Sequence, residues 1–384
     1  MGFSKGWKTE VCPFQGLENR YILPLLFDTI AVKIYFFGTK KIMKEQFANV
    51  PLRWVGPVKI TGPEVEGEFE LPLATYETPL FASVNRGARV ATASGGLKAV
   101  VIDDRMTRSV LFEAPDAIVA FQCLEKIKAD FLTLGKVVGT TSRFAKLIDL
   151  HSQIAGNLLF LRLEYTTGDA SGHNMVTQAS EAVMNQILEL CPELKYESLS
   201  GNFCTDKKAT AVNGILGRGK YVVAELTIPE KLVNKYLKST PEKIVQLNIR
   251  KNLIGTMLAG GLRSANAHYA NMLLAFYLAT GQDAANIIEG SQGTTLAEVR
   301  DGDLWFSVTI PNLIVGTVGS GKGLPFVEEA LTKLGCREER ESGANARRLA
   351  VLAAAAVFCG ELSLMAALTN PGELMAAHRK MERS

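Results

Sequence analysis

Four short segments of the sequence combine small, polar and ionisable side chains, the residue types from which proton-transfer and cofactor sites are built. Glu77 lies in a turn, and Asp283 ends a long apolar stretch. Residues 167–175 form a glycine-rich loop, and residues 200–208 place one aspartate next to two lysines. The glycine-rich loop suits the phosphates of a dinucleotide, which N–H groups at a helix N terminus attract. Taken singly, each segment also has an ordinary structural interpretation, as a solvated turn or a helix cap.

A second glycine-rich run, Gly316–Gly323 (GTVGSGKG), nearly matches the phosphate-binding pattern G-x-x-x-x-G-K-[ST]. Its last position is Gly323, so the hydroxyl that would bind Mg²⁺ is missing and a nucleoside triphosphatase loses its main chemical support. The run can still present N–H groups to an anion, which favours a cofactor-phosphate loop or a purely structural loop. Because no G-x-G-x-x-G follows a first strand, a dinucleotide would bind without the Rossmann arrangement.

Composition narrows the class of protein. The chain has 384 residues, enough for two domains, and its net charge of +3 without basic–aromatic runs argues against a nucleic-acid partner. The 6 cysteines form no C-x-x-C pair and the 4 histidines no H-E-x-x-H, so we expect a reducing compartment and no metal site. Charges interrupt the apolar stretch 21–37, and residues 349–368 are typical of a buried helix. We therefore expect a cytoplasmic protein without a membrane partner.

The pattern of apolar positions predicts the elements that must position these segments. Strands are predicted at 66–73, 95–102, 110–113, 157–165, 194–199 and 304–310, and helices at 116–132, 176–190, 252–280, 344–359 and 362–368. Strands that frame two helices within about 90 residues favour a small ferredoxin-like domain. The expected fold class is α+β, with a large, mainly helical substrate domain and an inserted small ferredoxin-like dinucleotide-binding domain.

The expected domain limits follow from this pattern. The small domain takes residues 109–199, and the large domain combines residues 1–108 with 207–384. Residues 1–60 are a candidate N-terminal subdomain, and residues 200–206 form a connecting loop that leads into the catalytic segment. A short polar tail ends the chain. No linker rich in proline, glycine or serine is present, which favours an insertion over two domains in tandem.

Four longer motifs follow one another along the chain: G-D-A-S-G-H-N-M at 168–175, S-G-N-F-C-T-D-K-K at 200–208, G-Q-D-A-A at 281–285 and G-E-L-S-L-M-A-A-L at 360–368. With them, the sequence from about residue 70 to the C terminus resembles the 3-hydroxy-3-methylglutaryl-CoA (HMG-CoA) reductase family. Several long motifs in a family's order are far more specific than one short pattern. The eukaryotic and archaeal class, in a soluble form, fits better than the bacterial class.

The resemblance implies an NAD(P)H-dependent oxidoreductase that reduces HMG-CoA to mevalonate and free CoA with two nicotinamide cofactors, through hemithioacetal and aldehyde intermediates. It places the catalytic residues at Glu77, Lys207, Asp283 and His378. Lys207 would stabilise negative charge on the substrate oxygen, and Asp283 would keep Lys207 charged. Glu77, with Asp283 as a neighbour, would protonate the alkoxide, and His378 would protonate the departing thiolate. A homodimer, or an assembly of dimers, with the active site at the subunit interface is also implied.

Binding residues are implied in the same way. For the substrate they are Leu80, Arg86, Arg108, Ser200, Lys208, Lys251, His268, Asn271, Leu364, Ala367 and Leu368. For the cofactor they are Ser142, Arg143, Phe144, Asp169, Ser171, His173, Asn174 and Arg383. An arginine beside a serine, as at 142–143, can hold a 2′-phosphate, so NADPH is favoured over NADH, which stays possible.

The chain departs from the family pattern at three places. Thr78 stands where glycine usually follows the catalytic glutamate, Ser171 and His173 replace methionines, and the dimerisation motif is not intact at residues 47–51. Thr78 beside Glu77 keeps open a related reductase for a different acyl-CoA. Two hypotheses from different classes of protein also stay open. One is a nucleotide-binding protein that uses the Gly316–Gly323 loop, and the second is a catalytically idle CoA- or dinucleotide-binding protein.

Overall fold

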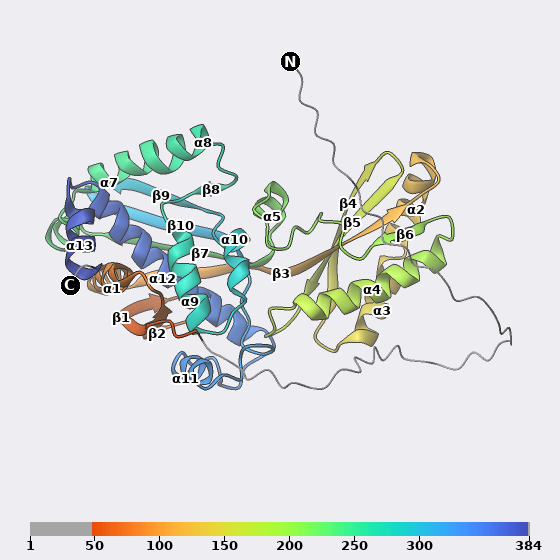
Figure 1. The fold of residues 1–384 in the computed structure, drawn as a ribbon, viewed down its shortest axis with the longest axis horizontal. Coiled ribbons are helices and arrows are strands. Elements are labelled where there is room, and N and C mark those ends of the chain that lie inside the picture. Colours follow the sequence, from red (N-terminus) through yellow and green to blue (C-terminus); the bar gives the residue numbers. More distant parts are fainter. Residues whose placement is uncertain (1–47, 383–384) are drawn as a thin grey trace, which may run out of the picture. The chain divides into compact units, whose positions relative to one another are not determined.

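The computed structural model describes residues 48–382, and residues 1–47, 383 and 384 lie outside the described part of the chain. Arg383 and most of the candidate subdomain at residues 1–60 therefore fall outside it. The described residues form an α+β fold with two groups of strands (Figure 1), and each group carries its own hydrophobic core. The predicted fold class is confirmed.

The first core is built on a mixed sheet with the strand order β2-β1-β3-β7-β10-β9-β8. Its strands are β1 (Leu52–Thr61), β2 (Gly67–Ala74), β3 (Leu97–Glu113), β7 (Gly219–Ile228), β8 (Ser264–Ala265), β9 (Gly293–Arg300) and β10 (Asp303–Leu313). β1–β3 and β8–β9 pair parallel, and the other neighbours pair antiparallel. Alternate residues of β7, such as Val222 and Ala224, are fully buried, as expected for strands that pack one face on a core.

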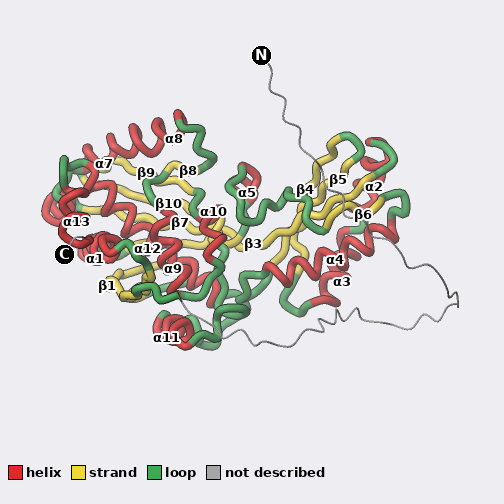
Figure 2. The backbone as a smooth tube through the Cα atoms, in the orientation of Figure 1, coloured by secondary structure: helices red, strands yellow, loops and turns green. Residues whose placement is uncertain are grey.

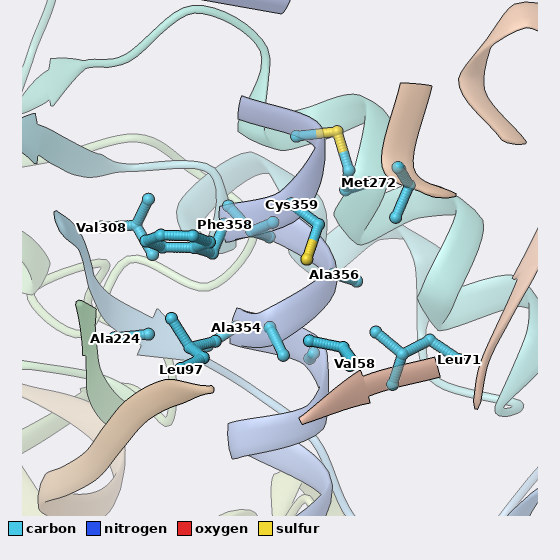
Figure 3. Packing of buried hydrophobic residues seen from close by; sticks show 14 of the residues in the cluster. Val58, Leu71, Leu97, Ala224, Met272, Val308, Ala354, Ala356, Phe358 and Cys359 are labelled. Atoms are coloured by element: carbon cyan, nitrogen blue, oxygen red, sulfur yellow. The ribbon is translucent and has the colours of Figure 1, made fainter. Parts of the chain in front are cut away.

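The longest described helix, α12 (Ala344–Leu368), runs through this first core. Figure 3 shows its Ala354 and Phe358 packed among residues of the sheet and of α9 (Tyr269–Ala279), Met272 among them. Gly87 of α1 (Thr78–Ala93) lets α1 approach closely, because a Cβ there would lie 2.0 Å from the carbonyl oxygen of Cys359. α12 is long and apolar enough to cross a membrane, but 94% of its most apolar window is buried inside the protein. The predicted buried helix is confirmed, and the two predicted C-terminal helices are one.

The remaining helices surround the first core or connect its strands. They are α5 (Ala211–Leu216), α6 (Glu230–Leu232), η1 (Val233–Leu237), α7 (Pro241–Leu247), η2 (Asn248–Gly255), α8 (Thr256–Leu258), η3 (Ala284–Asn286), α10 (Ile287–Gly290), α11 (Pro325–Lys333) and α13 (Glu373–Glu382). The predicted polar tail is thus a helix, α13, and it carries His378.

The second core has the ferredoxin-like arrangement that the sequence predicts. The C-terminal half of β3 pairs with β5 (Leu158–Thr166) and β6 (Lys195–Ser198), and β5 pairs with β4 (Lys146–Ala155), which gives the order β6-β3-β5-β4. Helices α2 (Ala117–Ala129), α3 (Phe131–Thr141) and α4 (His173–Leu190) cover it (Figure 2). β3 belongs to both groups of strands, so the expected limits at residues 109, 199 and 207 stay a prediction.

The single long helix predicted at 252–280 is wrong. The chain leaves η2 and α8, turns at Gly260 with φ +71 and Arg263 with φ +52, forms β8, and only then enters α9. Glycines have little preference for the helix and readily adopt positive φ, so they end it within an apolar run. Strands β7 and β9 were also missed, and the part expected to be mainly helical contains most of a large sheet.

Candidate active site

A cavity of about 540 Å³ lies where three loops meet, and we call it the charged cavity. Its walls come from the loop before α4, the loop that carries Lys207, and the Gly316–Gly323 loop. The described residues that line it include Arg108, Ser171, His173, Asn174, Asp206, Lys207, Arg218, Asp283 and Lys322. Segments far apart in the sequence thus bring a predicted ammonium, a predicted carboxylate and the predicted dinucleotide loop together.

Lys207 and Asp283 form an ion pair in this cavity, with 2.8 Å between Nζ and Oδ2. The hydrogen bond from Lys207 to Asp283 raises the pKa of Lys207. Burial tends to raise the pKa of Asp283, but hydrogen bonds from Lys207 and from the N–H of Ala285 outweigh it and lower the pKa. Both groups are therefore charged at neutral pH. The side chain of Lys207 is 40% exposed and that of Asp283 is 43% exposed. An ammonium so placed can meet an oxygen that gains negative charge.

The backbone around Lys207 is held in an unusual conformation. Asn202, Thr205 and Lys207 all have positive φ, at +59°, +42° and +57°. Such non-glycine conformations cost about 1–3 kcal/mol each and persist only where the surroundings enforce them. Glu289 supplies part of that enforcement, because its Oε1 accepts the N–H of Lys207 at 3.1 Å.

A buried ion-pair network supports Glu289. Arg218 is 1% exposed, and its two terminal nitrogens pair with Glu289 at 2.9 Å and with Asp206 at 3.0 Å. Burial raises the pKa of Glu289 although Arg218 acts in the opposite direction. Sequence reasoning missed Arg218 and Glu289, since neither belongs to a motif. Asp206 lies in the segment 200–208, but no role was predicted for it.

His173 begins α4 at the edge of the charged cavity. Burial and then the positive charge of Arg218 lower its pKa, although Asp206 and Asp283 act to raise it. Its Nε2 lies 3.8 Å from Oδ1 of Asp206. A lowered pKa makes the imidazole neutral at physiological pH.

The other predicted cofactor residues divide into two groups. Ser171 and Asn174 line the charged cavity with His173, whereas Asp169 is not among the described residues that line it. The carboxylate of Asp169 caps α12 instead, accepting N–H groups from Gly343 at 3.1 Å and Ala346 at 2.9 Å. The expected contact of Asp169 with the cofactor stays a prediction.

Ser142, Arg143 and Phe144 also lie outside the lining of the charged cavity. They connect α3 to β4, and the guanidinium of Arg143 stacks on the Phe144 ring at 4.6 Å. Phe144 reaches the glycine-rich loop, because a Cβ on Gly168 would lie 3.6 Å from its ring. The segment thus extends the surface that begins at the loop before α4.

A second cavity of about 380 Å³ lies between α1, α9, α12 and α13, and we call it the helix-lined cavity. The predicted residues that line it are Glu77, Leu80, Arg86, His268, Asn271, Leu364, Ala367 and His378. Oε2 of Glu77 accepts a hydrogen bond from Asn271 at 2.9 Å. Arg86 pairs with Glu373 at 2.6 Å, and Nδ1 of His268 lies 3.0 Å from Glu361. Leu368 ends α12 outside this lining.

Within one chain the four predicted catalytic residues are split between the cavities. No described residue lines both, so Glu77 and His378 lie on one side and Lys207 and Asp283 on the other. The expectation that Asp283 neighbours Glu77 is therefore not met within a single chain.

The predicted substrate-carboxylate residues are also divided. Arg108 lines the charged cavity, and its Nε is buried without a hydrogen-bond partner. Lys208 donates to the carbonyl of Asp206 at 3.1 Å, and Lys251, on η2, lies 3.4 Å from the side chain of Asn252. Lys208, Lys251 and Ser200 are not among the described residues that line either cavity.

One group of side chains has the composition of a metal site. The ligand atoms of Asp149, His151 and Glu164 lie within 4.8 Å of one another. However, Glu164 is fully buried and already pairs with Arg105 and Arg162, so its negative charge is balanced by guanidinium groups. We interpret the group as part of an ion-pair network, and the expectation of no metal site stays a prediction.

The geometry defines an α+β protein with an ion-paired lysine in a charged cavity walled by two glycine-rich loops and with a separate helix-lined cavity. The family model described as hydroxymethylglutaryl-coenzyme A reductase matches residues 46–383. The chain therefore belongs to the hydroxymethylglutaryl-coenzyme A reductase family.

Named relatives agree with this assignment. The chain is 47% identical over 338 residues to the 3-hydroxy-3-methylglutaryl-coenzyme A reductase of Pyrococcus abyssi, covering 87% of this chain and 82% of the relative. It is 41% identical over 385 residues to reductase 1 of Oryza sativa subsp. japonica, covering 99% and 69%. A class II reductase structure from Streptococcus pneumoniae, bound to NADPH, has a TM-score of 0.67 at 21% identity, covering 84% of this chain and 86% of that one. At that identity the likeness concerns the fold.

Proposed function

We propose that this protein reduces HMG-CoA to mevalonate and free CoA with two equivalents of NAD(P)H, in the cytoplasm. The observation that carries the proposal is the 2.8 Å ion pair of Lys207 and Asp283 in a cavity walled by two glycine-rich loops. A thioester carbonyl that accepts hydride becomes an oxyanion, and a preorganised cation lowers the energy of that oxyanion. Lys207 is the proposed cation, and Asp283 holds it charged and aimed.

The dinucleotide, when bound, supplies the hydride. The residues present fit such a group, because the N-cap residue before α4 is Gly172, which is left-handed with φ +93 and leaves the first N–H groups of the helix without a side-chain cap. Ser171, His173 and Asn174 add polar groups at the same place. We favour NADPH because the guanidinium of Arg143 stacks on Phe144, whose ring reaches the glycine-rich loop, and so provides a cation for a 2′-phosphate.

We propose that two copies of the chain complete each active site. The Lys207–Asp283 pair is open to the surface, at 40% and 43% exposure, and Glu77 and His378 line the other cavity. In a two-fold symmetric dimer, the helix-lined cavity of one copy can face the charged cavity of the other. Glu77 would then protonate the nascent alkoxide and His378 the departing thiolate. Arg86, His268 and Asn271 would contact CoA.

The primary test is product identification. Purified protein is incubated with HMG-CoA and NADPH or NADH, while NADPH absorbance, free thiol and mevalonate are followed. We expect two reduced cofactors consumed per mevalonate. A panel of other acyl-CoA thioesters tests the different substrate suggested by Thr78. Folded protein that turns over no thioester with either nicotinamide would remove the proposal.

Subunit complementation tests the shared site. Lys207→Met and Glu77→Gln proteins, each strongly impaired alone, are co-expressed in equal amounts so that their subunits pair at random. Such pairing in a two-fold dimer restores about a quarter of the wild-type activity, because half of the dimers are mixed and each mixed dimer contains one intact site. No recovery, with mixed dimers demonstrated by two affinity tags, would place all four groups in sites within one chain.

A further inference from the structure

Lys322 is a buried cation in the charged cavity that the proposed function does not use. It belongs to the Gly316–Gly323 loop, is 7% exposed and lines the cavity. Its Nζ donates to the carbonyl oxygen of Gly281, and no described carboxylate lies within ion-pair distance of it. A buried ammonium without an opposite charge is costly, so its presence in a cavity wall indicates an anionic ligand.

The loop that carries Lys322 is fastened to the predicted dinucleotide loop. The N–H of Thr317 donates to the carbonyl of Asp169 at 2.8 Å, and Ala170 and Val318 form a parallel β-bridge. Gly316 permits this contact, because a Cβ there would lie 2.3 Å from the backbone nitrogen of Ser171. The two glycine-rich loops therefore form one continuous wall.

The start of α4 adds a second source of positive potential to that wall. The helix has 18 residues and follows directly after Ser171 and Gly172, both of which line the cavity. Its first N–H groups and the helix dipole favour an anion. Ser320, from the loop of Lys322, lines the same cavity and provides a hydroxyl.

We propose that Lys322 binds the diphosphate of the nicotinamide dinucleotide, together with the N terminus of α4. The inference rests on the proposed function, since it requires that the charged cavity takes a dinucleotide. The proposal assigns a ligand to the Gly316–Gly323 loop. This loop is similar to a triphosphate-binding motif but lacks the hydroxyl that would bind Mg²⁺. Lys322 also contacts Gly281, two residues before Asp283. A diphosphate bound to Lys322 would therefore affect the Lys207–Asp283 ion pair.

The charged groups around Lys322 set the pH at which it titrates. Burial and then the positive charge of Arg337, which is paired with Glu328 behind the loop, lower the pKa of Lys322 to about 8, although Asp283 acts to raise it. The remaining charged groups that face the cavity are Arg108, His173, Asp206, Lys207 and Arg218. The pKa of Lys207 is raised and that of His173 is lowered, so both shifts move these groups away from the pH range near 8 in which Lys322 titrates.

The sign of the pH effect follows from linkage. Below the pKa of Lys322 the free protein already carries the charge, so affinity for the anion is independent of pH. Above it, binding must be accompanied by uptake of a proton, and affinity falls by up to about tenfold per pH unit. A bound diphosphate favours the charged form and raises the pKa of Lys322 in the complex.

The experiment measures NADPH binding directly, by fluorescence of the bound nucleotide, from about pH 6.5 to about pH 9.5. Wild type should show an affinity that declines above about pH 8. Lys322→Met should bind about 10–100-fold more weakly at neutral pH and without that decline, since a charge-assisted contact is lost. Lys322→Arg, which stays charged, should retain affinity and lose the pH dependence. Lys333→Met, at an exposed pair with Glu70, controls for the loss of one positive charge.

Three outcomes overturn the inference. The first is a wild-type affinity for NADPH that stays constant through this pH range. This measurement needs no variant, so the inference can be overturned even if Lys322→Met fails to fold. Equal affinity in wild type and a folded Lys322→Met protein, with reduced turnover, would make Lys322 a support for the Gly281–Asp283 segment and leave the proposed function standing. No dinucleotide binding by folded wild type overturns both the inference and the proposed function.

Discussion

The two cavities are held together by different means. In the charged cavity, loops with positive φ at Thr205 and Lys207 are tied down by a buried ion-pair network centred on Arg218 and Glu289. The helix-lined cavity is formed by helices that pack on the first core, and few polar contacts, such as Asn271 to Glu77 at 2.9 Å, complete it. In the charged cavity, an ion-pair network positions the charged side chains, whereas the helix-lined cavity takes its shape from hydrophobic packing.

This difference indicates how each cavity should respond to change. An ion-pair network in low dielectric is strong when complete and costly when one member is removed. A pocket between packed helices tolerates the loss of one surface hydrogen bond, because its walls are kept in place by the core. Substitutions in the ion-pair network should therefore affect both stability and turnover, and those in the helix-lined cavity should affect mainly turnover or binding.

The largest effect on turnover is expected for Lys207→Met. Removal of the cation that we propose faces the developing oxyanion should lower kcat by about 10²–10³-fold. Thermal unfolding should change little, since the side chain is 40% exposed and lies at the edge of the network. Lys231→Met, at an exposed position on α6, is the matched control. Wild-type kcat in a folded Lys207→Met protein would show that the charged cavity is not where the carbonyl reacts.

Arg218→Met tests the network itself. Glu289 would remain buried without its guanidinium, which should lower the free energy of unfolding by about 3–5 kcal/mol. Glu289→Gln should be milder, because its carbonyl oxygen can still accept the N–H of Lys207, and the double variant should recover part of the loss. Urea denaturation and kcat are measured together. Equal stability of Arg218→Met and wild type would contradict the view that the ion-pair network holds the charged cavity together.

In the helix-lined cavity, Glu77→Gln should separate chemistry from binding. Loss of the proposed proton donor should lower kcat by about 10²-fold. KM for the acyl-CoA should be nearly unchanged, since the glutamine carbonyl can accept the hydrogen bond from Asn271. Glu66→Gln, exposed between β1 and β2, is the control. A large rise in KM with constant kcat would assign Glu77 to binding.

The smallest effect is expected for Glu373→Gln, which breaks the pair that joins α13 to Arg86 of α1. Both side chains are about a quarter exposed, at 26% and 24%, so the free energy of unfolding should fall by less than about 1 kcal/mol. The freed guanidinium should lower KM for the acyl-CoA by up to about fivefold. A rise in KM instead would mean that the pair holds α13 in the position that binds substrate.

The sequence predicted the helices and strands whose formation depends on neighbouring residues. The alternation in β5 and the periodicity of α4 are visible in the sequence, and Asp116 caps α2 by accepting the N–H of Val119 at 2.8 Å. The candidates Glu77, Lys207 and Asp283 were predicted from motifs that occupy contiguous residues. The pairing of Lys207 with Asp283 was expected from the resemblance, and the distance agrees with it.

What the sequence could not show depends on contacts between distant residues. Arg218 and Glu289 are 71 positions apart, and nothing local marks Glu289 as a partner of Lys207 or Arg218 as a partner of Glu289. Asp169 lies in a motif, yet only the tertiary fold reveals that its carboxylate caps α12. The break between η2 and α9 was hidden because apolar periodicity continues across glycines that end the helix.

The 17-residue strand β3 has a consequence for handling the protein, because it contributes hydrogen bonds to both cores. A protease that cuts the backbone near residues 200–210 would sever one connection only, and the unbroken strand would keep the two halves in register. Nicked material should therefore elute with intact protein under native conditions and separate only in denaturing gels.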